Sequence, residues 1–182
     1  RFTAVYIDGV RVDSQASGGA SWEAIPLSLV DRIEVLRGPA AAVYGSDAVA
    51  GVVQIFTKKG EAGVSPYVGV GNGTHRTWKA EAGVSGASGA VDYAIGLARE
   101  GSKGFSASTR ATSNPDRDGY TSTSANARLG LQVNRAHRLE GTLLHNDSDS
   151  GYDTSKADDR SLHRLQTLGL AWQAQWSETY KT

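Results

Sequence analysis

SANARLGLQV, residues 124–133, is the stretch of sequence that decides the fold. Its apolar residues Ala125, Ala127, Leu129 and Leu131 alternate with polar or small residues. A period of two is the pattern of a β-strand whose two faces meet different surroundings. Together with this stretch, five further segments that alternate in the same way give six candidate strands. The five are residues 65–71, 77–84, 91–98, 138–143 and 167–176.

The connections between these segments alternate in length. Residues 86–89 and 134–137 are short turns, whereas residues 101–119 and 147–160 are long and polar. Short turns at one end and long loops at the other are typical of an outer-membrane β-barrel. Several segments also approach the roughly 9–11 residues that a membrane-spanning strand needs. The pattern therefore favours a transmembrane antiparallel barrel, and a soluble β-sandwich with one wet face is the alternative.

The two faces of the candidate strands carry different side chains. Lys79, Glu81, Arg128 and Glu140 share the polar face, which suits a wet or plugged lumen. An open sheet of six strands leaves unpaired backbone groups at both edges, and hydrocarbon does not tolerate them. We therefore expect the chain to be a piece of a larger barrel. The apolar face carries the tryptophans that suit the aromatic girdles at a lipid interface: Trp78, Trp172 and Trp176.

Composition excludes several classes of function. Lysine plus arginine and aspartate plus glutamate both number 19, so the net charge is zero and no nucleic-acid partner is indicated. The absence of cysteine excludes disulfides, thiolate zinc sites and a cysteine nucleophile. Because methionine is also absent, we expect the chain to begin inside a longer protein. The histidines are scattered without metal-ligand spacing; only His145 near Asp147 could suggest a general-base pair, so an enzyme is not favoured.

The first sixty residues have a different, mixed character. Asp8-Gly9 between two β-prone runs predicts a hairpin turn, because type I′ turns need two residues at positive φ. Pro26 is placed to open a short helix, and residues 40–44 predict another, closed by Gly45. Strands are expected at 32–36, with one buried face, and at 52–57. We therefore divide the chain into a small α+β domain, residues 1–60, and the first strands of a barrel, residues 61–182.

Four ordered motifs in the first domain carry a family resemblance: VYIDGVR (5–11), IPL (25–27), VDRIEVLRGP (30–39) and YGSDAVAGVV (44–53). Together they resemble the second half of the plug domain of TonB-dependent outer-membrane receptors, and most of all that of the cobalamin receptors. The resemblance implies a plug inside a barrel of about 22 strands in the bacterial outer membrane. On this resemblance, we expect the sequence to lack the early plug, the TonB-contacting segment (the TonB box) and the later barrel strands.

The resemblance also implies a function and partners. It implies active uptake of a scarce bulky nutrient, most of all cobalamin, energised by a TonB-type protein. A siderophore or haem receptor of the same family is the first alternative. A soluble β-sandwich for binding or adhesion is an alternative of another class.

Roles for particular plug residues follow from the resemblance. Ala16, Ser17 and Gly18 correspond to the apical loop that touches substrate. Glu34 and Arg37 lie on the plug strand whose charges meet charges on the barrel wall.

Two acidic segments raise the possibility of a metal site. NPDRDG, residues 114–119, places oxygen-bearing side chains at alternate positions before a glycine, which resembles the start of a calcium loop. It is not an EF-hand, because residue 125 is alanine where a glutamate is required. The other segment, between 147 and 159, falls on the same side of the sheet. It contains Asp147, Asp149, Tyr152, Asp153, Asp158 and Asp159.

The resemblance selects a calcium-ligand set from these segments. Ser106 stands where a further aspartate is expected, which puts a second ion in question. The alternative is a pair of solvated acidic loops. The implied ligands are Asn114, Asp116, Asp118, Tyr152, Asp153 and Asp158.

Overall fold

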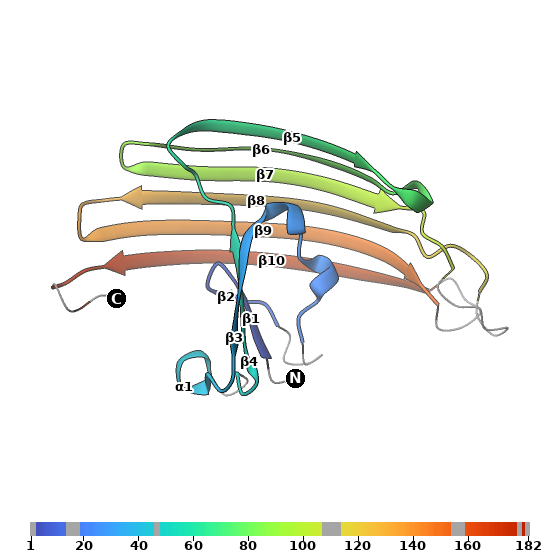
Figure 1. Cartoon of the computed structure of the whole chain (residues 1–182), viewed down its shortest axis with the longest axis horizontal. Helices are drawn as coiled ribbons and strands as arrows, with labels where there is room; N and C mark the ends of the chain where they lie inside the picture. Colours follow the sequence, from blue (N-terminus) through green and yellow to red (C-terminus); the bar gives the residue numbers. More distant parts are fainter. Residues whose placement is uncertain are drawn as a thin grey trace.

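A computed structural model of the chain describes residues 3–13, 19–45, 48–106, 114–153, 159–177 and 180. Its strands form two sheets, one of four strands and one of six. Figure 1 shows the six long strands side by side as a curved wall, with the smaller sheet running across it and extending beyond β10, where α1 lies. None of the described helices is long and apolar enough to cross a bilayer.

The small sheet has the order β2-β1-β4-β3. β1 pairs parallel to β4, and β3 pairs antiparallel to β4. The predicted hairpin turn between β1 and β2 is confirmed, since Asp8 and Gly9 have φ of 47° and 82°. The four strands are β1 Thr3–Ile7, β2 Val10–Arg11, β3 Val30–Arg37 and β4 Gly51–Thr57.

The helices of this part are short. The helix expected after Pro26 is a single 3₁₀ turn, η2 Leu27–Leu29, and Pro26 is its N-cap. α1 spans Ala41–Tyr44, within the segment predicted to be helical. Another 3₁₀ turn, η1 Trp22–Ala24, precedes η2.

β3 differs from its prediction. Its alternating sequence suggested one buried face, but every residue after Val30 is exposed. β3 is the last strand of the small sheet and pairs only with β4, so no described element covers Ile33, Val35 and Leu36. Alternation identified the strand correctly, but it gave no information on what covers its apolar face.

The large sheet is an antiparallel meander in which each strand pairs with the next along the chain. All six predicted strands are present, and they are 10 to 16 residues long. The β5–β6 connection holds the 3₁₀ turn η3 Thr74–Arg76. The strands are β5 Gly63–Asn72, β6 Trp78–Ser88, β7 Val91–Ser102, β8 Tyr120–Gln132, β9 His137–Tyr152 and β10 Asp159–Ala174.

The two faces of the large sheet differ as the alternation predicts. In β8, Ser124, Asn126 and Arg128 are buried on the face toward the small sheet, whereas Leu129 and Leu131 are exposed on the opposite, outer face. One apolar cluster joins the two sheets, because Leu144 of β9 packs against the buried residues of the first part. The cluster comprises Val5, Ile7, Ile25, Leu29, Ile55 and Leu144. The fold is thus a plug-like α+β unit seated on one arc of an antiparallel barrel wall.

Candidate functional site

Three carboxylates converge where β7, β8 and β9 reach their long connections. Asp116, Asp118 and Asp153 each offer an oxygen, and these oxygens all lie within 4.8 Å of one another. The backbone holds the segments together, because the Gly151 N–H donates to the Gly119 carbonyl at 2.8 Å and the Asp118 N–H donates to Phe105 at 3.3 Å. Carboxylate oxygens at this spacing are the ligands that a hard divalent cation takes.

Two details of this cluster bear on whether it can bind a cation. Within the part of the chain that the structure describes, Asp153 Oδ1 is buried and has no hydrogen-bond partner. The Ser106 hydroxyl donates to the other oxygen, Oδ2, at 3.4 Å. Ser106 therefore lies at the cluster, although it brings a neutral hydroxyl where a carboxylate was expected. A buried, unpartnered oxygen on the half-buried Asp153, beside two further carboxylates, fits calcium in the chemistry of its donors.

The other residues of the implied ligand set have different outcomes. Tyr152 ends β9 directly before Asp153, and its side chain is 44% exposed. Asn114 is half-buried at the start of the described part of the loop. Asp158 lies outside the described residues.

Asp147 and Asp149 belong to β9, not to a loop as expected. Asp147 pairs with Arg164 of β10, Nε to Oδ1 at 2.6 Å, and Asp149 pairs with Arg160, Nη2 to Oδ2 at 2.6 Å. His145 Nε2 lies 2.9 Å from Asp147 Oδ2, as the sequence suggested. This pair is part of an outer-face ladder of charges that also includes Arg164.

The substrate loop expected from the resemblance, Ala16, Ser17 and Gly18, lies outside the described residues. The residues before it are firmly held. Asp13 accepts hydrogen bonds from Arg11 at 2.9 and 2.6 Å and from the Val5 N–H at 3.1 Å. The Arg11 guanidinium and the Val5 N–H together hold the pKa of the Asp13 carboxyl below its usual value.

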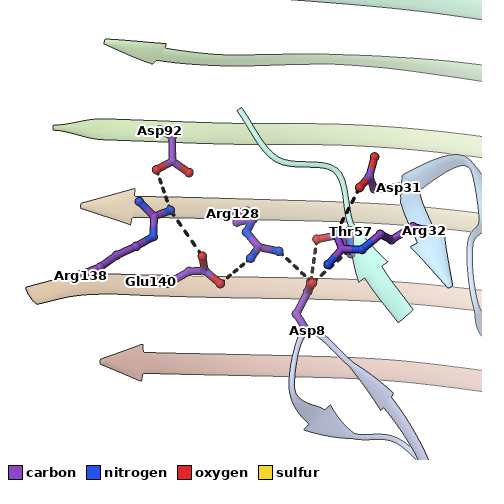
Figure 2. A network of polar contacts seen from close by, with 8 residues as sticks. All are labelled: Asp8, Asp31, Arg32, Thr57, Asp92, Arg128, Arg138 and Glu140. Atoms are coloured by element: carbon purple, nitrogen blue, oxygen red, sulfur yellow. Dashed lines mark hydrogen bonds and ion pairs between the residues drawn. The ribbon is translucent and has the colours of Figure 1, made fainter. Parts of the chain in front are cut away.

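A buried ionic network joins the plug-like unit to the wall, as Figure 2 shows. Asp8, at the β1–β2 turn, accepts a hydrogen bond from Arg128 of β8 at 2.8 Å. The side chains of Asp8 and Arg128 are only 5% and 4% exposed. Asp8 also accepts from the Thr57 hydroxyl at 2.6 Å and from the Thr57 N–H at 3.0 Å. The turn is therefore fixed both to its own sheet and to the barrel wall.

The network continues along the wall toward the short turns (Figure 2). Arg128 also pairs with Glu140 of β9, and Arg138 links Glu140 to Asp92 of β7, with 2.7 Å between Arg138 Nη2 and Asp92 Oδ2. Charges of opposite sign thus alternate through five residues. Sequence analysis placed Arg128 and Glu140 on the inner face but missed Asp8, whose partner lies 120 residues away along the chain.

Glu34 and Arg37, the residues expected at the plug–barrel contact, both lie exposed on β3. Glu34 accepts a hydrogen bond from its strand neighbour Arg32 at 2.8 Å. Their contact with the barrel wall stays a prediction. Within the described residues, Asp8 and Arg128 form an ion pair between the plug-like unit and the wall.

A hollow of about 490 Å³ is lined by residues of the η1–η2 segment and of the inner face of the wall. Trp22, Leu27 and Ile55 line it from the plug-like side, and Lys79 and Glu100 from the wall. Its lining is mostly apolar with two opposite charges, which suits contact with a large, amphiphilic molecule.

Comparisons with known proteins agree with this architecture. Residues 1–52 match the family model of the TonB-dependent Receptor Plug Domain. The vitamin B12 transporter BtuB of Photobacterium profundum is 32% identical over 178 residues, which covers 97% of this chain and 29% of that relative. The BtuB of Vibrio vulnificus (strain YJ016) is 51% identical over 57 residues, covering 31% of this chain and 9% of that protein.

Solved structures share the fold. The siderophore receptor PirA from Acinetobacter baumannii has a TM-score of 0.70 at 21% identity, over 96% of this chain and 30% of its own. The pyoverdine-bound FpvA of P. aeruginosa has a TM-score of 0.79 at 16% identity, over 98% of this chain and 26% of its own. The chain thus spans about three tenths of the length of its relatives. The plug-domain match, the relatives and the shared fold together identify the chain as part of a TonB-dependent receptor of the bacterial outer membrane that resembles the vitamin B12 transporters.

Proposed function

We propose that the receptor carrying this chain takes up cobalamin across the outer membrane, with energy from a TonB-type protein. The observation that carries the proposal is the similarity to a vitamin B12 transporter over 97% of the chain, through both the plug and the strands. The siderophore receptors resemble the chain at 16–23% identity, so they support the fold alone.

In this proposal the chain binds and releases a ligand and performs no covalent chemistry. The Asp8–Arg128 pair holds one turn of the plug to the wall while the rest of the plug rearranges. The segment after Asp13 and the hollow beside Trp22 are the surfaces that a bulky ligand would meet. Residues 16–18 would contact it most closely.

Equilibrium binding of cyanocobalamin to the full-length receptor in detergent tests the substrate. We expect saturable binding that an equimolar ferric siderophore, such as ferric enterobactin, does not displace. Saturable binding of the ferric siderophore without binding of cyanocobalamin would assign the receptor to the siderophore class instead.

We further propose that the receptor binds calcium through Asp116, Asp118 and Asp153. The proposal is supported by the convergence of their oxygens within 4.8 Å and by the buried, unpartnered Oδ1 of Asp153. Asn114, Tyr152 and Asp158 would complete the coordination. Calcium would neutralise three carboxylates that otherwise repel one another, and so order the loops that face the ligand.

Calorimetric titration of the metal-free receptor with calcium tests this site. We expect a binding heat that disappears in Asp116→Ala/Asp118→Ala. The matched control is Asp147→Ala/Asp149→Ala, which removes the same charge from the outer face of the wall and should keep the heat. Equal heats in both double variants, or no heat in the unaltered receptor, would contradict the proposal.

A further inference from the structure

The outer face of the wall is apolar only over part of its height. In the register of the sheet, Trp172 of β10 lies opposite Leu139. Near the short turns, the rings of Trp172, Trp176 and His137 pack in tilted and edge-to-face pairs, with centroids 5.5 to 5.7 Å apart. Toward the long loops, Trp78 occupies the row that also contains Leu162. Along β10 they mark two levels, that of Leu162, which shares a register row with Trp78, and that of Trp172.

The separation of the two levels matches a bilayer. Residues 162 and 172 are about ten positions apart on one strand, which is about 33 Å of strand at roughly 3.3 Å per residue. With the usual tilt of about 40°, the height is about 25 Å, the height of the apolar band of an outer-membrane barrel. Leu168, opposite Leu143, lies between the levels and is 70% exposed.

A row of polar side chains crosses the outer face two residues inside the register row of Trp78. Backbone pairing aligns Arg164 with Asp147, Asp147 with Thr123, and Thr123 with Arg99. We name these four residues the arginine row. Each lies on the outward parity of its strand, and Arg164 is 69% exposed while paired with Asp147. Arg99 is exposed, with its guanidinium carbon 6.0 Å from the centre of the Trp78 ring.

Placing the arginine row in the hydrocarbon core would cost free energy. An arginine on the lipid face costs about 2–4 kcal/mol at the bilayer midplane and about 0–1 kcal/mol near the interface. The row lies two residues inside the register row of Trp78, so it borders the apolar band, and its long arginine side chains extend outward to the lipid headgroups. Arg160 lies on β10 four residues nearer the long loops than Arg164; it is 60% exposed and paired with Asp149. Counting Arg99, Arg160 and Arg164 against Asp147 and Asp149, the patch has an excess of one positive charge.

We propose that the arginine row binds the two phosphates of a bisphosphorylated glycolipid in the leaflet on the long-loop side. Arg99 and Arg164 lie three strand spacings apart, about 14 Å between backbones. That distance exceeds what one phosphate spans and suits a disaccharide headgroup with a phosphate at each end. Beside Arg164 lies an open hollow of about 470 Å³ that is lined in part by Thr121, Thr123, Asp147 and Arg164, where sugar hydroxyls would find polar partners. Guanidinium groups bind phosphate in a bidentate fork, and Asp147 holds one of them in place.

Lipid binding to the purified full-length receptor in detergent, measured by native mass spectrometry, tests the proposal. The probes are bisphosphorylated lipid A, the same glycolipid without phosphates, and phosphatidylglycerol. We expect the receptor to retain bisphosphorylated lipid A, and Arg99→Gln/Arg164→Gln to lower its affinity about tenfold or more. A control variant, Arg135→Gln, removes an exposed arginine from the short turn at the opposite end of the wall and should leave the affinity unchanged.

Each other outcome overturns the proposal. Equal affinity in the double variant would show that the arginines do not bind the headgroup. If the receptor retained the glycolipid without phosphates as well as bisphosphorylated lipid A, the contact would be apolar packing alone. If it retained phosphatidylglycerol equally well, a single phosphate would suffice, and two spaced phosphates would not be recognised. Because both arginines are exposed, the double variant should fold normally, as resistance of the barrel to unfolding in cold SDS would verify.

Discussion

Arg128 is the residue on which the contact between plug and wall depends. It is 4% exposed and pairs with both Asp8 and Glu140. Removing one partner of a buried ion pair leaves the other charge uncompensated, at a cost of about 3–5 kcal/mol. Arg128→Met should therefore loosen the β1–β2 turn, seen as faster amide hydrogen exchange at Thr57, whose N–H donates to Asp8.

The matched control for this prediction is Arg32→Met. Arg32 pairs with Glu34 on β3, but its side chain is 47% exposed, and exposed pairs contribute about 0–1 kcal/mol. Exchange at Thr57 should be unchanged in that variant. Equal acceleration in both variants, or none in either, would show that the buried pair does not fasten the plug.

Individual contacts were harder to predict from sequence than the faces on which residues lie. Arg128 was placed correctly on the inner face because its neighbours alternate with a period of two. Its partner Asp8 was assigned only to a turn, because local turn chemistry contains no information about a residue 120 positions away. The acidic cluster was predicted in part: Asp116, Asp118 and Asp153 do converge, whereas Asp147 and Asp149 face outward.

At the scale of elements, alternation located the strands but not their ends. The polar residues 147–152 suggested a loop, yet β9 continues to Tyr152 and β10 begins at Asp159. Charged residues at outward positions, each paired across the strands, preserve the period of two in a region that a hydrophobicity pattern does not recognise. The length of these strands could not be inferred without the pairing.

The β7–β8 connection depends on a glycine. Gly104 has φ of +63°, and a Cβ there would collide with the backbone of Asp118, one of the clustered carboxylates. Gly104→Ala should displace Asp118 and weaken calcium binding by roughly tenfold, which corresponds to about 1.4 kcal/mol, by calorimetry. Gly89, in the β6–β7 turn, has φ of +59° with nothing within 4 Å of a Cβ, so Gly89→Ala imposes backbone strain alone. Calcium affinity reduced equally in both variants would remove the link between Gly104 and the cluster.

At the scale of the whole molecule, the described strands leave two surfaces uncovered. β5 and β10 pair on only one side, and the outer face exposes Leu162, Leu168 and Leu170 at 77%, 70% and 85%. In water, such an apolar face and such open edges would promote association. In a bilayer, the apolar face is solvated by lipid, and the inner face is covered by the plug through Leu144 and the ionic network.

This arrangement predicts how substitutions on the outer face depend on depth. Leu162 and Leu168 share a strand and a face, but Leu162 lies near the long-loop end of β10, whereas Leu168 lies about midway between Leu162 and Trp172. In the full-length receptor refolded into phosphatidylcholine vesicles, Leu168→Arg should lower the free energy of unfolding by about 2–4 kcal/mol, and Leu162→Arg by about 0–1 kcal/mol. Denaturant titration followed by tryptophan fluorescence measures both. A soluble sandwich with water on this face would tolerate both arginines equally, so equal and small effects would exclude a lipid-facing wall.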